Sequence, residues 1–280
     1  MMQQQETIEV SKGDATEEVL RGERFGFGAN WARFLGELTP DRIAGAESSL
    51  RRMLGADSLA GLRFLDAGSG SGLTSLAARR LGAQVLSFDF DPKSVACTTE
   101  LRRRYYPNDP AWQVEAGSVL DGRYLERLGT FDVVCSWGVL HHTGDMHKAL
   151  QNITQRVAPG GLLYVALYND QGWISKYWSL VKRQYNRGAV RRWVLTAVHT
   201  PYLCGVRIVA RAVTGRLRLE RGMSYWYDML DWLGGWPFEV ARPNDIVDFY
   251  AARGFDLRQL RVVGTRAGCN EFVFRRASAG

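Results

Sequence analysis

Short apolar segments alternate with longer amphipathic ones between residues 62 and 170. A short apolar run bounded by turn residues is typical of a buried strand, and a longer segment with apolar positions three and four apart is typical of a helix. The predicted strands cover 62–68, 83–91, 111–117, 131–138 and 160–170, and the predicted helices between them cover 72–82, 91–105 and 145–157. This order predicts an α/β fold with a mostly parallel sheet.

The alternation stops at residue 170 and resumes near residue 243. The intervening segment predicts helices and an aromatic stretch, and the closing segment predicts a helix and two strands. These elements cover 174–185, 191–212, 223–240, 244–253, 255–263 and 270–276. Ahead of the first strand, residues 25–54 predict one or two helices over the edge or mouth of the sheet. We therefore divide the chain into an N-terminal cap at 1–59, a core domain at 60–169 and 243–280, and an insertion at 170–242.

Length and composition fit a single large α/β domain with an insertion, because 280 residues is near the size at which single cores stop growing. The chain has no apolar run long enough to span a bilayer and no secretory signal, so we expect a cytoplasmic protein. Four widely spaced cysteines show no CxxC pair and are expected to be buried, reduced thiols. They are Cys97, Cys135, Cys204 and Cys269.

The net charge of +7 resides entirely in residues 169–242, which hold twelve Lys or Arg, five Asp or Glu, and six of the nine tryptophans. Our first interpretation is a lid over an anionic or aromatic small molecule, and our second is packing on the sheet or on a second subunit of a homodimer. Peripheral membrane contact, which would suit a lipid-soluble small molecule, ranks third. Nucleic acid, to which basic residues interleaved with aromatic ones can bind, ranks last.

A glycine-rich loop follows the first predicted strand in the sequence "FLDAGSGSG". Glycines allow a tight turn and let a ligand approach the backbone, and the N-terminus of the next helix offers free N–H groups. Asp89 ends the second strand, where a carboxylate can accept both hydroxyls of a ribose. The pattern indicates a nucleoside-containing ligand, of which NAD is one candidate, with a plain structural turn as the alternative.

Four motifs in order, "FLDAGSGSG", "SFDFD", "GSVLD" and "FDVVCSWGVLHH", resemble the class I S-adenosylmethionine-dependent methyltransferases. The resemblance covers residues 60–169 and, more loosely, 243–276. It implies a Rossmann-like, seven-stranded, mostly parallel sheet, with S-adenosylmethionine as cofactor and S-adenosylhomocysteine as product. Many relatives carry Asp where this chain has Ser118. The implied cofactor residues are Asp66, Gly68, Gly70 and Gly72 for the methionine part, Asp89 for the ribose, and Phe90, Ser118, Val119 and Ser136 around the adenine and the strand end.

Three of the four histidines lie in residues 135–147. His141 and His142 are adjacent, and His147 is five positions further on, so no pair has the i,i+3 or i,i+4 spacing that brings two metal ligands to one helix face. We therefore predict no metal site and expect His147 on the surface.

His141 and His142 follow the fourth strand, beside the point where ligands bind in open parallel sheets. We predict that one of them is the general base for methyl transfer, since histidine accepts a proton near neutral pH. The alternative is that they only shape the loop. The residues expected to contact the acceptor are Trp137, Tyr168, Asn169, Asp170, Tyr225, Trp226 and Asp228.

The sequence thus predicts an S-adenosylmethionine-dependent methyltransferase that acts on a small molecule, with O-methylation preferred over N-methylation. An NAD-dependent oxidoreductase and a cofactor-binding interaction module are the two alternatives.

Overall fold

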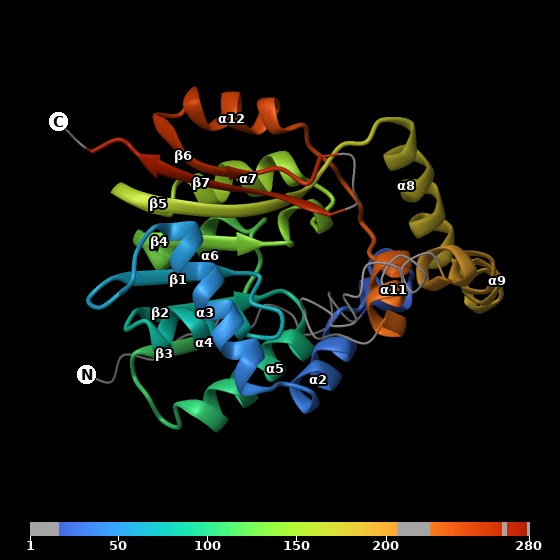
Figure 1. Ribbon diagram of the computed structural model, residues 1–280, viewed down its shortest axis with the longest axis horizontal. Helices are drawn as coiled ribbons and strands as arrows, with labels where there is room; N and C mark the ends of the chain where they lie inside the picture. The colour runs from blue at the N-terminus through green and yellow to red at the C-terminus, as the bar shows by residue number, and fades with distance from the viewer. Residues whose placement is uncertain (1–16, 206–224, 265–267, 279–280) are drawn as a thin grey trace.

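The computed structural model describes residues 17–205, 225–264 and 268–278 and contains a seven-stranded sheet in the order β3-β2-β1-β4-β5-β7-β6 (Figure 1). β7 runs antiparallel to both β5 and β6, and the other paired strands are parallel. The strands are β1 (Arg63–Ala67), β2 (Gln84–Asp89), β3 (Trp112–Ala116), β4 (Phe131–Trp137), β5 (Val157–Tyr168), β6 (Phe255–Arg261) and β7 (Cys269–Arg276). The predicted fold class and strand number are confirmed.

The helices cover both faces of this sheet, and each face has its own apolar core. Residues of α3, α4 and α5 fill one core, and residues of α6, α7 and α12 fill the other. The helices of these two layers are α3 (Pro40–Leu54), α4 (Leu73–Arg80), α5 (Pro92–Tyr105), α6 (Gly122–Leu128), α7 (Met146–Thr154) and α12 (Pro243–Ala251).

Aspartates begin three of the crossover helices. The carboxylates of Asp91, Asp121 and Asp145 each accept a hydrogen bond from a backbone N–H in the first turn of α5, α6 and α7. Such caps satisfy N–H groups that have no partner inside the helix. Asp145, which lies close to the histidines in sequence, therefore serves to start α7.

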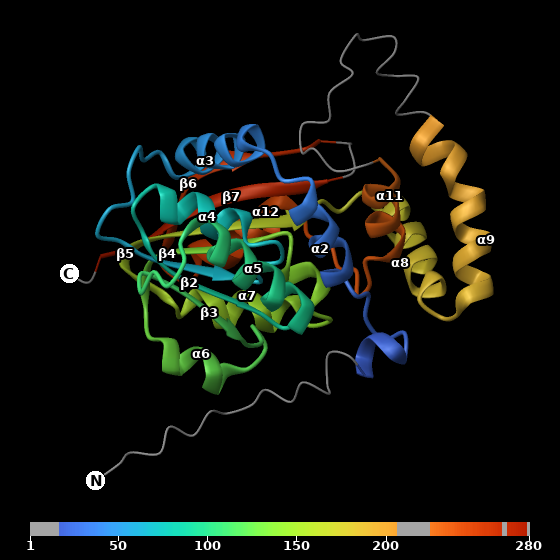
Figure 2. The ribbon, with the colours of Figure 1, turned by 90° about the horizontal axis from the view of Figure 1, so that it is seen from below.

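The predicted insertion forms a helical layer beyond the carboxyl ends of the parallel strands (Figures 1 and 2). It contains α8 (Trp173–Tyr185), α9 (Ala189–Thr200), a single π turn at Pro201–Gly205 and α11 (Tyr225–Gly234). A third apolar cluster, which includes Trp178, Met229 and Leu233, holds these helices together. The helix predicted over 191–212 begins at Ala189, and its α-helical part ends at Thr200 because a π turn follows; residues 206–212 lie outside the described part.

Within the described ranges, no helix is both long and apolar enough to cross a membrane. Cys97 and Cys135 are buried free thiols, as expected, whereas Cys269 is only half-buried. Cys204 lies outside the residues whose side chains are described.

Candidate functional site

The glycine loop between β1 and α4 has the conformation that its sequence predicts. Gly68, Gly70 and Gly72 have φ values of 86°, 54° and 79°, a region that favours glycine. A Cβ on Gly68 would lie only 2.4 Å from a methyl group of Val139, in the loop that follows β4. The loop therefore brings its backbone close to that second loop, and side chains would block the approach.

Asp89 lies at the end of β2, beside this loop. Its Oδ2 accepts a hydrogen bond from the Gly70 N–H at 2.9 Å, and its Oδ1 accepts one from the Asp91 N–H at 2.9 Å. Two carboxylate oxygens have four acceptor positions between them, so Asp89 can still accept a hydrogen bond from a ribose hydroxyl. Burial raises the pKa of Asp89 to about 6. The loop and this carboxylate fit the predicted cofactor.

Asp66, expected to hold the methionine part of the cofactor, is buried under the loop. Its carboxylate accepts a hydrogen bond from the Ser75 hydroxyl, which also bonds to the Ser87 hydroxyl at 2.7 Å. The Trp112 indole N–H donates to Ser87 at 2.9 Å. Burial raises the pKa of Asp66 to about 6. This network fixes α4 against β2, and a contact of Asp66 with the cofactor stays a prediction.

The expected adenine side of the site contains Phe90, Ser118 and Val119. The guanidinium of Arg24 lies 5.0 Å from the centre of the Phe90 ring, so a cation–π contact covers the ring in this structure. The Ser118 hydroxyl accepts a hydrogen bond from the Leu120 N–H at 3.2 Å. Val119 is buried in the sheet core. Ser136, by contrast, donates its hydroxyl to the Ala67 carbonyl at 2.7 Å and is fully buried, so it joins β4 to β1.

His141 and His142 form a short 3-10 turn (Leu140–His142) after β4, and both are buried. The Nδ1 atom of His142 lies 2.6 Å from the carbonyl oxygen of Pro237. A carbonyl oxygen only accepts, so Nδ1 carries the proton and Nε2 keeps a lone pair. Burial, with smaller effects of Lys182 and Arg24, lowers the pKa of His142 to about 3. His142 is therefore a neutral imidazole that presents an acceptor nitrogen.

His141 has the opposite tautomer. Its Nδ1 accepts a hydrogen bond from the Tyr168 N–H at 3.2 Å, so the proton is on Nε2. Among the residues that the structure describes, this buried Nε2–H has no hydrogen-bond partner. Burial holds the pKa of His141 well below its usual range. Of the two adjacent histidines, one thus offers an acceptor and the other a donor.

Aromatic rings surround this pair. The Tyr168 ring lies 3.9 Å from the His141 ring and 5.4 Å from the His142 ring, measured between centroids. Phe238 and Trp232 pack on the other sides of Tyr168, at 5.3 and 5.5 Å. The Trp232 indole N–H is also buried without a partner among the described residues. Tyr168 was expected to contact the acceptor, and the structure places it at the centre of this aromatic cluster.

Lys182, on α8, extends this cluster and was not predicted. It is fully buried, donates to the Trp232 carbonyl oxygen, and lies 4.3 Å from the Trp232 ring and 4.8 Å from the Phe238 ring. The insertion thus brings a cation close to the two histidines. A lysine among a dozen basic residues gave no signal in the sequence that could single it out.

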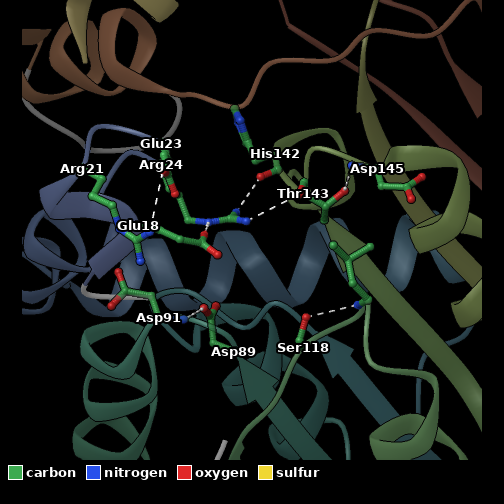
Figure 3. Close-up of polar contacts among 11 residues, drawn as sticks. Glu18, Arg21, Glu23, Arg24, Asp89, Asp91, Ser118, His142, Thr143 and Asp145 are labelled. Atoms are coloured by element: carbon green, nitrogen blue, oxygen red, sulfur yellow. Dashed lines mark hydrogen bonds and ion pairs between the residues drawn. The ribbon is translucent and has the colours of Figure 1, made fainter. Parts of the chain in front are cut away.

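The N-terminal segment crosses the mouth of the site. Arg24 donates to the carbonyl oxygens of His142 at 2.7 Å and Thr143 at 3.4 Å, and forms an ion pair with Glu18 at 2.7 Å (Figure 3). Figure 3 shows Asp89 and Asp91 below this guanidinium. Arg24 therefore connects the adenine side of the site, at Phe90, with the histidine loop.

Helix α2 (Gly28–Gly36) continues this segment along α5. The Gly28 N–H donates to the Asp91 carboxylate at 2.9 Å, and the Trp31 indole lies against Gly70. The cap predicted at 1–59 thus contains residues of the site, which the sequence reasoning missed. The signal available was "FGFG", a glycine pair directly before a helix.

Three of the residues expected to contact the acceptor have partners within the protein. The Trp137 indole N–H is 3.4 Å from the Glu271 carboxylate, a partner on β7. Asn169 bonds to the Gly264 carbonyl oxygen and to Asn270, while Asp170 pairs with Arg242. Tyr225, Trp226 and Asp228 begin α11, and their side chains lie outside the described residues.

His147 is exposed on α7, as predicted, with its ring against Phe249. The described residues contain no group of three or more His, Cys, Asp or Glu side chains that could hold a metal ion.

The strand order, the glycine loop and the carboxylate at the end of β2 define a Rossmann-like methyltransferase fold. Residues 39–259 match the model of a family described as a methyltransferase domain, and the chain belongs to this family of class I S-adenosylmethionine-dependent methyltransferases. The family predicted from the four motifs is confirmed.

Curated relatives match part of the chain. A ubiquinone biosynthesis O-methyltransferase of Rhizobium rhizogenes is 35% identical over 112 residues, which is 40% of this chain and 43% of the relative. Another from Sinorhizobium fredii is 30% identical over 142 residues, covering 49% of this chain and 55% of the relative. The chain therefore spans about half the length of the curated relatives it matches.

Among solved structures, a magnesium protoporphyrin IX methyltransferase from Synechocystis PCC 6803 with bound SAH is similar, with a TM-score of 0.55. It is 14% identical, and the match covers 93% of this chain and 100% of that one. At this identity the likeness shows the fold alone.

Proposed function

We propose that this protein transfers the methyl group of S-adenosylmethionine to a hydroxyl oxygen of an aromatic small molecule, with His142 as the general base. One observation supports His142 as the base: its Nδ1–H donates to the Pro237 carbonyl oxygen, which leaves Nε2 as the acceptor. His141 has its lone pair engaged by the Tyr168 N–H and offers only a donor. The family, the glycine loop and Asp89 support the choice of cofactor.

The cofactor supplies an electrophilic methyl group on a positively charged sulfur. With S-adenosylmethionine bound, His142 Nε2 would accept the hydroxyl proton of the acceptor, and the positive charge would then lie on the imidazole. Methyl transfer removes the charge of the sulfur, so the net charge of the buried site would not change. Burial lowers the pKa of His142 to about 3, which keeps Nε2 unprotonated at neutral pH but makes it a weak base, so we expect the proton to transfer only together with the methyl group.

The surroundings of the histidines favour an aromatic acceptor that carries oxygen atoms. Tyr168, Phe238 and Trp232 provide flat apolar surfaces against which a ring can stack. The buried N–H groups of His141 and Trp232 are donors for an acceptor's second oxygen. Relatives named ubiquinone biosynthesis O-methyltransferases agree with a ring hydroxyl. N-methylation is the less favoured alternative, and the proposed reaction needs no metal.

Calorimetry and single-residue variants test this function. The wild-type protein should bind S-adenosylmethionine, and Asp89→Asn should weaken that affinity by at least about tenfold, because one ribose hydroxyl loses its acceptor. Turnover is then measured by mass spectrometry with a panel of catechols and hydroxybenzoates.

With an accepted substrate, His142→Asn should lower kcat by about 10²–10⁴-fold without weakening cofactor affinity. The exposed His147→Asn is the matched control and should retain wild-type turnover. Absence of cofactor binding at millimolar concentration would refute the enzyme, and full activity of His142→Asn would refute the assigned base.

A further inference from the structure

Helix α9 exposes an apolar stripe to solvent. Val190, Trp193, Val194, Ala197 and Val198 recur at i, i+3, i+4, i+7 and i+8, which places them on one face. All five are exposed, with 78% of Val190, 73% of Trp193 and 64% of Val198 accessible. An amphipathic helix in a folded protein normally turns this face inward, so the stripe has the orientation of a binding surface.

Helix α8 exposes a second stripe. Trp173, Tyr177 and Leu180 are spaced i, i+4 and i+7 and are 76%, 46% and 58% exposed. The opposite side of the same helix, at Trp178 and Val181, is buried in the apolar cluster of the insertion. The exposed positions are therefore additional to those that fold the insertion.

The two helices lie side by side at the end of the molecule away from the sheet, with α9 outermost (Figure 2). A groove of about 290 Å³ joins them and is lined by Gln184, Val190, Arg191, Val194 and Leu195. Of the fourteen large apolar side chains exposed in the described residues, eight lie between 173 and 202. Because most of these exposed apolar side chains lie on α8 and α9, they indicate a single surface, which we call the α8–α9 face.

The charge of this region has one sign. The sequence contains no Asp or Glu from 171 to 219. Lys176, Arg183, Arg187 and Arg191 are exposed beside the apolar stripes. Basic side chains at the margin of an apolar face with exposed tryptophans are typical of helices that lie in the interface of an anionic membrane.

We propose that the α8–α9 face docks on the surface of an anionic lipid bilayer, with both helices in the plane of the membrane. Charge complementarity favours this occupant over a second copy of the chain, because a twofold contact would place the same basic residues opposite one another without any acidic partner. Helix α9 has twelve residues, about 18 Å, and is too short to span a bilayer. The proposal does not require methyl transfer. If both hold, a lipid-soluble acceptor could reach the site from the membrane.

Co-sedimentation with vesicles tests the proposal on the full chain. We expect the wild-type protein to pellet with vesicles of phosphatidylcholine and phosphatidylglycerol, and to do so less at high salt. Trp193→Ser with Val198→Ser should lower the partition coefficient by more than about tenfold. Arg187→Gln should lower it about fivefold on the anionic vesicles and leave binding to pure phosphatidylcholine unchanged.

Matched controls come from other exposed positions. The double variant Leu257→Ser with Leu260→Ser changes two apolar side chains on β6 that are each 38% exposed. The variant Arg51→Gln changes an exposed arginine on α3. Both control variants should pellet like the wild type. Circular dichroism and thermal melting confirm that each variant is folded.

Three results would overturn the proposal: no pelleting of the wild type, equal loss in the control variants, or a dimer in analytical ultracentrifugation that the α8–α9 variants dissociate. Calorimetry with S-adenosylmethionine on the same preparations separates the two proposals. Cofactor binding without pelleting refutes only the membrane surface, and pelleting without cofactor binding refutes only the enzyme.

Discussion

The burial of His142 should make the stability of the protein depend on pH. Burial lowers the pKa of His142 from 6.5 to about 3 in the folded protein. Between these values the unfolded chain binds a proton that the folded protein does not bind. The contribution of His142 to stability is therefore fully present above pH 6.5 and is lost as the pH falls toward 3. From pH 7 to pH 5 the loss is about 2 kcal/mol.

The wild-type pH profile alone does not isolate this effect. Burial raises the pKa values of Asp66 and Asp89 to about 6, so the folded protein binds their protons more readily than the unfolded chain. Their contributions have the opposite sign, because each aspartate favours the folded state increasingly as the pH falls from 6 toward 3.8. A comparison of two proteins that share both aspartates removes these contributions.

The measurement is the free energy of unfolding in urea for the wild type and for His142→Asn, at pH 7 and at pH 5. Asparagine does not titrate, so the difference in stability between the two proteins should move by about 2 kcal/mol in favour of the variant at the lower pH. His147→Asn, at an exposed position, should show no such movement. If the difference for His142→Asn is the same at both pH values, His142 titrates as in the unfolded chain and burial does not lower its pKa.

Two further predictions concern the mouth of the site. Arg24→Gln removes the charged hydrogen bonds to the histidine loop and should weaken S-adenosylmethionine binding about tenfold in calorimetry. Arg21→Gln, which changes an exposed ion pair, should leave the affinity unchanged. Equal affinities of the two variants would contradict the role of Arg24. Gly68→Ala combines a φ of 86° with a clash against Val139 and should lower the free energy of unfolding by about 3 kcal/mol. Gly55→Ala, whose φ is 63° with open space around it, should cost only about 1 kcal/mol in the same denaturation experiment, and similar costs would refute the clash.

The fold was predictable from local sequence because each element satisfies its own rules. Asp91 followed by Pro92 begins α5, and the spacing of glycines in "DAGSGSG" sets the turn after β1. The apolar runs of β4 and β5 are buried on both faces, as parallel strands require. These signals lie within a few residues of the structure that they specify.

The site was less predictable because its polar partners come from distant segments. Asn169 and Asp170 follow β5, where acceptor contacts were expected, yet the hairpin between β6 and β7 and Arg242 engage them. Arg24 lies more than a hundred residues from the loop that it binds. Nothing in a local pattern distinguishes such an arginine from the 35 other basic residues of the chain.

The insertion determines which of the two adjacent histidines presents an acceptor nitrogen. His141 and His142 have the same side chain and nearly the same burial, and they differ because a backbone N–H of β5 faces one while the Pro237 carbonyl faces the other. Pro237 belongs to the segment that returns from α11, and the neighbouring Glu239 N–H donates to the His141 carbonyl oxygen at 2.9 Å. A displacement of α11 would therefore remove the acceptor that holds the proton on His142 Nδ1. The helical insertion and the proposed general base form one structural unit, so contacts that reposition α11 are expected to change the basicity of His142 as well.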